Sequence, residues 1–322
     1  MRGRSSLAHV LLAAAPILRG RLRRRAVGAA LRLAPGSFDA ARAWTDLLLA
    51  TGDGEPGTQA AVTAVVAESL LHELQRRSPL DESEAGRLLG TVIHLRSAGL
   101  VCHGQLLQDA WVLSMTGMQR NAYFVEFGAL DGTAHSNTLL LERDFGWTGV
   151  LVEPSRKYHE RLRGTRRATV DVRCVAGRSN ERVQFLECGD LSTMWGYGES
   201  DRHRAVRARA TEVTEVVTVS LNDLLTEHRA PREPDFLSID TEGSELDILR
   251  AFDFSGHRPR LMCVEHNHTS AEREIDRLLA RHGYRRCLPR VSQWDGWYVH
   301  ADFEVPGGPA SRPGPSAATP RR

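Results

Sequence analysis

The spacing of apolar residues changes along the chain. Between Thr58 and Gly117, apolar residues recur at intervals of three and four, as in AVTAVVAESLLHELQRR, which predicts amphipathic helices. After Asn121, short apolar runs alternate with helical stretches, a pattern typical of βαβ units and a parallel sheet. The runs that we predict to be strands are Tyr123 to Phe127, Gly149 to Glu153, Asp171 to Val175, Asp235 to Ile239 and Leu261 to Glu265.

Two further extended runs, Arg182 to Glu187 and Glu215 to Leu221, lie between the third and fourth predicted strands. They flank the irregular stretch CGDLSTMWGYGESDRHR, which is polar and carries glycine and aromatic residues. Such a segment is either a loop that covers a ligand or acceptor, or a passive surface loop. The pattern leaves both interpretations open.

The two ends of the chain differ from its middle. The first 33 residues hold eight arginines and no acid around the apolar run Leu7 to Leu18, which is shorter than the ~20 residues that span a bilayer. This arm is either a basic helix that contacts a membrane surface or a partner, or a solvated, poorly ordered segment. The last residues, PGGPASRPGPSAATPRR, predict disorder. We therefore expect a basic arm (1–57), a helical lead-in (58–120), an α/β domain (121–304) and a disordered tail (305–322).

Composition narrows the class of protein. The 322 residues are 41% hydrophobic and 25% charged, values of a globular protein with a sizeable core. The net charge of +2 gives no electrostatic reason to expect a nucleic-acid partner. Five scattered cysteines without CxxC spacing indicate reduced thiols, which predicts a cytoplasmic protein and argues against a thiolate zinc site.

The segment FVEFGALDG ends the first predicted strand and precedes a helical run. Gly128 and Gly132 permit a tight turn and the close approach of a ligand to the backbone. A dinucleotide site would need GxGxxG, but Leu130 interrupts that pattern, so a ligand without phosphates is favoured. S-adenosylmethionine (SAM) is such a ligand, because Glu126 and Asp131 can compensate its cationic groups. The alternative is a turn that serves packing alone.

Two more acids follow predicted strands. Glu153 ends the second strand about twenty residues beyond the turn, where a carboxylate can accept both ribose hydroxyls of a nucleoside. Enzymes that bind NAD place an acid similarly, and a carboxylate at the start of a helix is the other interpretation. Asp240 ends the fourth strand, DFLSID, at the edge of the sheet where ligands of open α/β sheets bind. We expect Asp240 to face the same crevice as Gly128.

The fifth strand ends in CVEHNH, and strand alternation predicts Glu265 and Asn267 on one face and His266 and His268 on the other. An acceptor hydroxyl needs a base, and histidine, with an ordinary pKa of ~6.5, suits that role. Asp240 and His266 are our candidates. The two histidines could also ligate a metal with Asp240, but two histidines and distant acids are a loose signal, so we predict no metal.

The motifs, taken in order, resemble those of the FkbM-type methyltransferases. The matching segments are QDAWVL, NAYFVEFGALDGTAHSNTLLLERDFGWTGVLVEP, VTVSLNDLL, FLSIDTEGSELDIL and VEHNH, which together cover roughly residues 105 to 300. The resemblance implies a class I methyltransferase fold with a Rossmann-like, seven-stranded sheet and an antiparallel last strand. Tyr284 to Leu288 and Gly296 to His300 would be the final two strands.

The same resemblance implies that the chain uses SAM to methylate a hydroxyl, often on a sugar or secondary metabolite. By position it assigns Glu126, Gly128 and Gly132 to the methionine part of SAM, Glu153 to the ribose, and Asp240 to the crevice near the sulfonium. Many family members have Asp where Glu126 stands, which keeps the charge. The predicted cofactor-binding residues are Glu126, Gly128, Asp131, Gly132, Asn137, Glu153 and Asp240.

We therefore predict a SAM-dependent O-methyltransferase that acts on a small-molecule or glycan acceptor. One alternative is a nicotinamide-dependent oxidoreductase, which the missing GxGxxG opposes. The other is a noncatalytic protein that keeps the fold and docks to a protein or membrane through its basic N-terminus.

Overall fold

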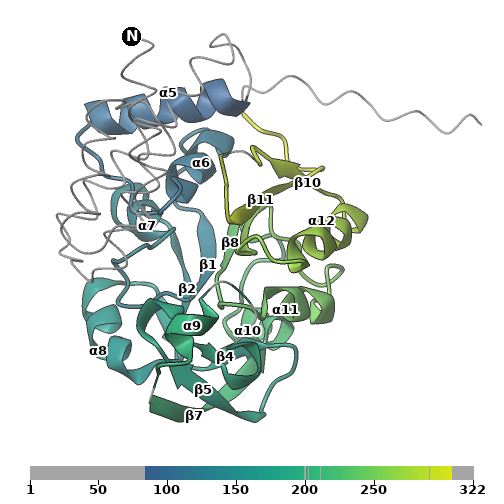
Figure 1. Ribbon diagram of the computed structural model, residues 1–322. Helices are drawn as coiled ribbons and strands as arrows, with labels where there is room; N and C mark the ends of the chain where they lie inside the picture. The colour runs from purple at the N-terminus through teal and green to yellow at the C-terminus, as the bar shows by residue number, and fades with distance from the viewer. Residues whose placement is uncertain (1–83, 199–200, 202, 211, 290, 307–322) are drawn as a thin grey trace, which may run out of the picture.

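The computed structural model describes residues 84–306, apart from 199–200, 202, 211 and 290 (Figure 1). The basic arm, the first part of the helical lead-in and almost all of the tail lie outside these residues, so the domain boundaries and the membrane-surface role of the arm stay predictions. No helix within the described residues is both long and apolar enough to cross a membrane.

A seven-stranded sheet forms the centre of the molecule (Figure 1). Strand β11 runs antiparallel to both of its neighbours, whereas the pairs from β9 across to β3 are all parallel. This arrangement confirms the predicted class I methyltransferase sheet, including the antiparallel last strand. In spatial order the strands are β10 (Tyr284–Cys287), β11 (Asp295–His300), β9 (Leu261–Glu265), β8 (Phe236–Ile239), β1 (Tyr123–Phe127), β2 (Thr148–Val152) and β3 (Thr169–Asp171).

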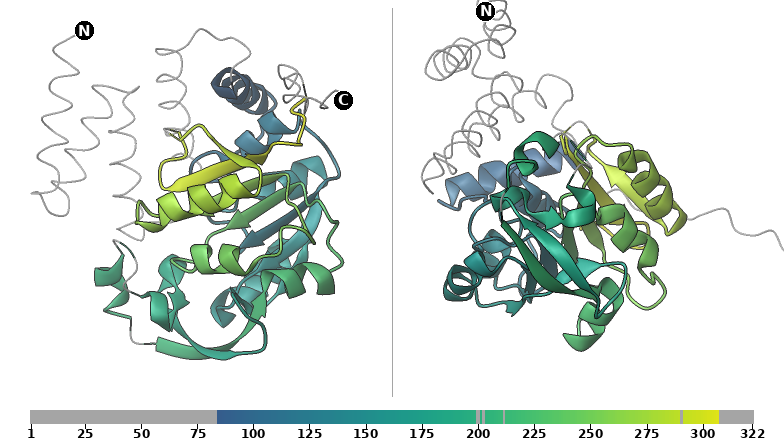
Figure 2. Two further views of the ribbon diagram at one scale, coloured as in Figure 1. Left: turned by 90° about the vertical axis from the view of Figure 1, so that its right-hand side faces the viewer. Right: turned by 60° about the horizontal axis from the view of Figure 1, so that its bottom comes forward.

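The central strands are buried on both faces, which explains their nearly continuous apolar sequences. Successive residues serve different cores: Phe124 belongs to the cluster on one face and Val125 to the cluster on the other. Helices cover both faces (Figure 2). The first cluster includes residues of α5 (Glu84–Ser97), α6 (Gln108–Met115), α7 (Leu139–Phe145) and α8 (Arg156–Thr165), and the second includes residues of α10 (Leu221–Glu227), α11 (Glu245–Ala251) and α12 (Ala271–Arg281).

The predicted strand from Asp171 to Val175 is wrong as a single element. The chain forms β3, which ends at Asp171, and then β4 (Cys174–Ala176), which pairs with β7 (Glu212–Ser220) in a second sheet. Asp171 explains the break: its carboxylate accepts a hydrogen bond from the backbone N–H of Arg173 at 2.9 Å, so the chain turns there. The guanidinium of Arg173 and the ring of His228 hold the same carboxylate.

The second sheet, in the order β4-β7-β5-β6, contains the extended runs predicted on either side of the irregular stretch. Strand β5 (Arg182–Glu187) has the predicted bounds, and β7 begins three residues earlier than predicted. The stretch between these two strands, hereafter the insert (188–211), lies near the carboxyl ends of the main strands (Figure 1). It holds η2 (Gly189–Leu191), β6 (Thr193–Met194), η3 (Trp195–Tyr197) and α9 (Arg204–Arg207).

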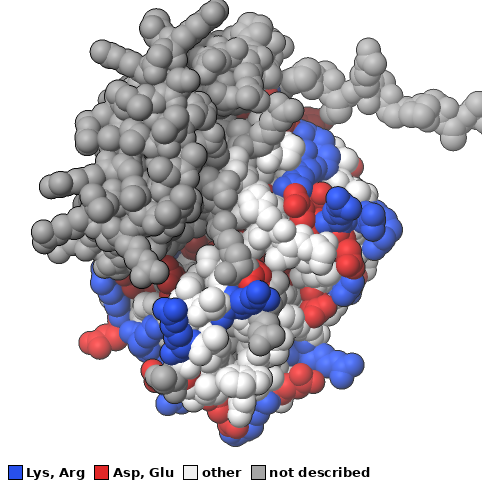
Figure 3. Space-filling view, in the orientation of Figure 1, with Lys and Arg blue, Asp and Glu red and all other residues white. Residues whose placement is uncertain are grey.

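Basic and acidic side chains are interspersed over the described part of the face drawn in Figure 3. Several form surface pairs, such as Arg250 with Glu274 and Arg258 with Asp302. Pairs of this kind are worth ~0–1 kcal/mol each, so they contribute little to the stability of the fold.

An aromatic stack holds α6, which precedes β1 in the chain, against β11 of the main sheet. Trp111 of α6 and Trp297 of β11 are fully buried, with ring centroids 5.1 Å apart. We expect Trp297→Ala to lower the free energy of unfolding by about 3–5 kcal/mol, because it removes the ring and leaves a cavity. Trp195→Ala is the matched control, since that ring is 58% exposed. Urea denaturation of both variants checks this; equal, small effects would contradict it.

Candidate functional site

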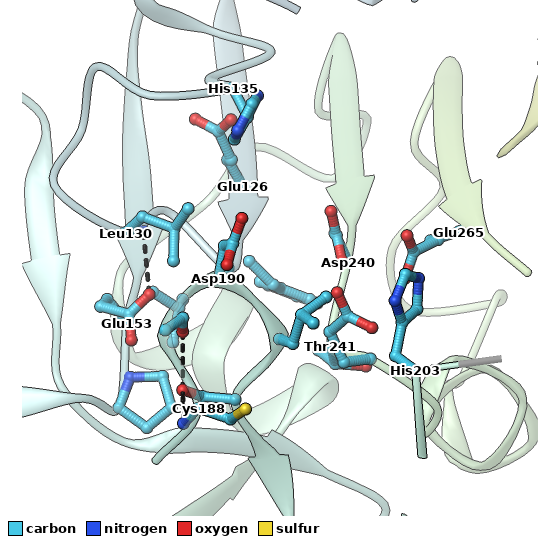
Figure 4. Close-up of a pocket in the computed structure, with 18 of the residues that line it drawn as sticks. Glu126, Leu130, His135, Glu153, Cys188, Asp190, His203, Asp240, Thr241 and Glu265 are labelled. Carbon is cyan, nitrogen blue, oxygen red and sulfur yellow. Dashed lines mark hydrogen bonds between the residues drawn. The ribbon is translucent and has the colours of Figure 1, made fainter. Parts of the chain in front are cut away.

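A cavity of about 580 Å³ lies at the carboxyl ends of β1, β2, β8 and β9, the edge predicted to bind a ligand. Gly128, Glu153, Asp240 and Glu265 line it from the main sheet, and residues of the insert line it as well (Figure 4). In that view Asp190 of the insert is drawn between Glu153 and Asp240. The insert is therefore a wall of the cavity and not a passive surface loop.

Gly128 lies where the turn after β1 packs closely against the end of β8. Its φ is +71°, and a Cβ added to it would lie 2.3 Å from the carbonyl oxygen of Asp240. Only glycine fits there, both for its backbone conformation and for the close approach. Gly128 and Asp240 are thus brought to the same cavity, as predicted from their strand ends.

Gly132 and Asp131, two predicted cofactor residues, are not among the cavity-lining residues. A Cβ on Gly132 would meet Leu162 and Arg166, so this glycine serves the packing of the turn against the region of α8. The carboxylate of Asp131 accepts from the backbone N–H of Thr133 at 2.8 Å and pairs with Arg161. Both residues shape the turn, and neither faces the cavity as the prediction required.

Glu126 lines the cavity, but its carboxylate is already heavily bonded. It accepts from the backbone N–H of Asn137 at 2.6 Å and from the hydroxyls of Ser136 and Thr138, and the guanidinium of Arg166 lies 3.7 Å away. Its bonds hold the loop before α7 against β1. Glu126 therefore positions that loop, and it contributes charge to the cavity wall.

Asn137 also lines the cavity and has one free hydrogen-bonding atom. Its Nδ2 donates to Ser238 Oγ at 2.9 Å, whereas its buried Oδ1 has no partner. A buried acceptor without a partner costs about 1–3 kcal/mol, so a bound donor at this position would be stabilised.

Glu153 accepts hydrogen bonds from the turn after β1 and from the residue that precedes α8. Its Oε2 accepts from the backbone N–H of Leu130 at 2.8 Å (Figure 4), and its Oε1 accepts from the backbone N–H of Ser155 at 2.8 Å. Burial raises the pKa of Glu153 to about 7, although these two bonds oppose the shift. A carboxylate has about four acceptor positions, so Glu153 keeps capacity for ligand hydroxyls.

Three acids gather at the ends of β8 and β9. Carboxylate oxygens of Asp240, Glu242 and Glu265 lie within 4.8 Å of one another, and all three residues line the cavity. Burial raises all three pKa values, that of Asp240 to about 8. The next cause is the charge of Asp295 for Asp240, and the charge of Asp240 for Glu242 and Glu265. We call this cluster the acidic wall.

Sequence reasoning did not assign Glu242 and Glu265 to the site. Glu242 has a φ of +59° and lies in the turn between β8 and α11, against the cavity. Glu265 ends a parallel strand as Asp240 does, so the strand-end rule contained a usable signal. His135, Asp190 and His203 also line the cavity, and only the folded chain brings them there.

His266, a predicted base, is not among the cavity-lining residues. It is buried with its Nε2 3.0 Å from Arg286 Nη2, and burial lowers its pKa to about 4. The strand itself ends at Glu265, because Asn267 and His268 have positive φ values. The predicted grouping still holds, since Glu265 and Asn267 line the cavity and His266 and His268 do not. Of the two candidates for the base, only Asp240 lines the cavity.

The acidic wall makes stability depend on pH. Because folding raises the pKa of Asp240 from 3.8 to about 8, its stabilising contribution is present at low pH and is lost as pH rises through about 8. We expect Asp240→Asn, which does not titrate, to gain more melting temperature relative to the wild type at about pH 8 than at about pH 5, by roughly 2–4 °C per kcal/mol. Calorimetric scans with a chelator present measure this. Asp302→Asn, at an exposed side chain, is the control; an equal shift at both pH values for Asp240→Asn would contradict the account.

Among solved structures, the chain is similar to the FkbM methyltransferase of Methylobacillus flagellatus KT, with 18% identity, 73% of this chain and 59% of that one covered, and a TM-score of 0.35. It is also similar to precorrin-6y C5,15-methyltransferase from Geobacter metallireducens GS-15, with 12% identity, coverage of 59% and 85%, and a TM-score of 0.31. No curated protein matches the chain. The chain spans 59% of the length of the first of these structures.

The family comparison covers most of the residues that line the cavity. The model of the methyltransferase FkbM domain matches residues 126–286, half of the chain, from Glu126 on β1 through the insert to β10. The match, the sheet order and the cavity at the carboxyl edge lead to one conclusion: this chain belongs to the FkbM methyltransferase family.

Proposed function

We propose that the protein transfers a methyl group from SAM to a hydroxyl oxygen of a small, polar acceptor such as a sugar. Membership of a methyltransferase family supports the reaction class. The observation that carries the choice of cofactor is the charge of the cavity: its described lining includes six carboxylates and no lysine or arginine. Such a lining attracts a cationic ligand and repels a pyrophosphate, which disfavours the nicotinamide alternative.

The side chains along β1 and β2 suit the polar groups of SAM. The buried, unpartnered Oδ1 of Asn137 would accept from the ammonium group, and Gly128 leaves the room that a side chain would fill. Glu153 has acceptor capacity left for the two ribose hydroxyls. We infer that Asn137, Gly128 and Glu153 hold the cofactor, while Glu126 contributes charge and fixes the loop of Asn137.

SAM, when bound, supplies a methyl group activated by the adjacent sulfonium cation. The protein contributes position, exclusion of water and a place for the acceptor's proton. Asp240 suits this last task because a base works best when its pKa is near the operating pH, and burial raises that of Asp240 to about 8. Other polar residues of the cavity lining, among them Ser192 and Asn267, would bind further hydroxyls of the acceptor.

The affinity for SAM should depend on pH through Glu153. Only the ionised carboxylate accepts from both ribose hydroxyls, so we expect the affinity to rise as pH increases through about 7. Glu153→Gln should weaken binding at about pH 8 by roughly tenfold, since one charge-assisted bond is worth about 1.5 kcal/mol, and should flatten the rise. Titration calorimetry at several pH values measures both effects.

Glu160→Gln, at an exposed position of α8, is the matched control and should bind as the wild type does. A pH profile that Glu153→Gln leaves unchanged would remove Glu153 from the cofactor site. Heat on titration with NAD and none with SAM would favour the oxidoreductase instead.

Measurements of kcat and of SAM affinity should distinguish the role of Asp240 from that of the residues proposed to bind the cofactor. Incubation with SAM labelled in its methyl group and a panel of sugars, glycans and lipids, followed by mass spectrometry, identifies the acceptor. With that acceptor, Asp240→Asn should lower kcat about 10²–10⁴-fold and change SAM affinity far less. Glu274→Gln, on the exposed face of α12, should retain full activity. Transfer at the wild-type rate by Asp240→Asn would refute its role, and SAM binding without transfer to any acceptor would support the noncatalytic alternative.

A further inference from the structure

The described protein places few cations beside the acidic wall to balance its charge when the three acids are ionised. Asp240, Glu242 and Glu265 are at most intermediate in exposure, and their oxygens lie within 4.8 Å of one another. Glu242 pairs with Arg207, but that guanidinium also pairs with the buried Asp201, so one cation is shared by two acids. Within the described residues, Asp240 and Glu265 form no ion pair with lysine or arginine. When these acids are ionised, the wall therefore carries buried negative charge that the described cations do not balance.

Glu265 adds an observation of a different kind. Its side chain is only 8% exposed, it lines the cavity, and its buried Oε2 has no hydrogen-bond partner. A buried carboxylate oxygen without a partner is costly, and such groups in proteins are normally paired or coordinate a metal. Figure 4 shows the carboxylates of Asp240 and Glu265 at neighbouring strand ends, beside the cavity.

We propose that the acidic wall binds one divalent cation that prefers oxygen ligands, such as Mg²⁺ or Mn²⁺, through the carboxylates of Asp240, Glu242 and Glu265. Three carboxylates are a donor set for hard cations, which are typically held by a few carboxylates with water or substrate at the remaining positions. The charge also favours this occupant, because a single positive charge would leave the wall strongly negative.

The second cluster with suitable spacing is less fit for a cation. It consists of His266, His268 and Glu272, whose ligand atoms are similarly close. Arg286 already lies there, with Nη2 3.0 Å from His266 Nε2 and Nη1 2.7 Å from Glu272 Oε1. A guanidinium in contact with two of the three groups repels a metal ion and uses their lone pairs.

A cation in the acidic wall would complete the acceptor side of the cavity. Three protein ligands leave positions open in a six-coordinate ion, and an acceptor oxygen bound at one of them would become more acidic. Asp240 would then hold the ion and would not take the proton directly. This catalytic role rests on the proposed methyl transfer; the binding of the cation does not.

The experiment is a titration of the full chain with Mn²⁺, followed by electron paramagnetic resonance, in the absence of SAM and acceptor. We expect one saturable site that Mg²⁺ competes for. Glu265→Gln should weaken it at least tenfold, which corresponds to about 1.4 kcal/mol. Asp190→Asn is the matched control: it removes a carboxylate from the same cavity but outside the wall, and its Mn²⁺ affinity should stay within about threefold of the wild type.

Absence of a saturable site in the wild type, unchanged binding by Glu265→Gln, or an equal loss in Asp190→Asn would each overturn the proposal. If Glu265→Gln does not fold, Asp240→Asn provides the same comparison. SAM calorimetry on the same samples separates the two proposals. SAM binding without Mn²⁺ binding would overturn the cation site alone, and Mn²⁺ binding without SAM binding would overturn the cofactor assignment alone.

Discussion

The contact between Gly128 and the carbonyl of Asp240 is the constraint on which the site depends. Because a Cβ at residue 128 would lie 2.3 Å from that carbonyl oxygen, the turn after β1 and the end of β8 are held together as one unit. The turn lines the side of the cavity where we propose that the cofactor binds, and the end of β8 contributes Asp240 to the acidic wall. A larger residue at position 128 would displace both sides at once, so substitutions there cannot separate cofactor binding from the chemistry of Asp240.

The second organising feature is buried negative charge. Glu153 and Asp240 have pKa values raised to about 7 and about 8 because the cavity removes them from water. Burying these carboxyl groups costs free energy, and a cationic ligand bound in the cavity would offset that cost. Groups with strongly shifted pKa values are common at functional sites. Arg207 ties the insert to the same region, since it pairs with Asp201 of the insert and with Glu242 of the wall. These two ion pairs thus connect the insert to the acidic wall.

Sequence patterns predicted the framework well because its determinants are local. Strand ends and turn glycines placed Gly128, Glu153 and Asp240 at one edge, and they line one cavity. The apolar pattern did not predict where individual residues end a strand. Asp171 ends a strand through hydrogen bonds to Arg173, and the positive φ values of Asn267 and His268 end another, which leaves His266 against Arg286. Asp131 and Gly132 match the motif yet serve the turn, since a motif does not distinguish a residue that shapes a turn from one that touches a ligand.

The acidic wall could not be predicted with the same ease, because it combines a strand end, a turn residue of unusual backbone conformation and a second strand end. A crystal structure of the protein grown with S-adenosylhomocysteine would show whether this cavity is a SAM pocket. We expect the ribose to lie against Glu153 and the amino-acid end to lie between Gly128 and Asn137. A ligand bound elsewhere, or with its ribose away from Glu153, would contradict that expectation.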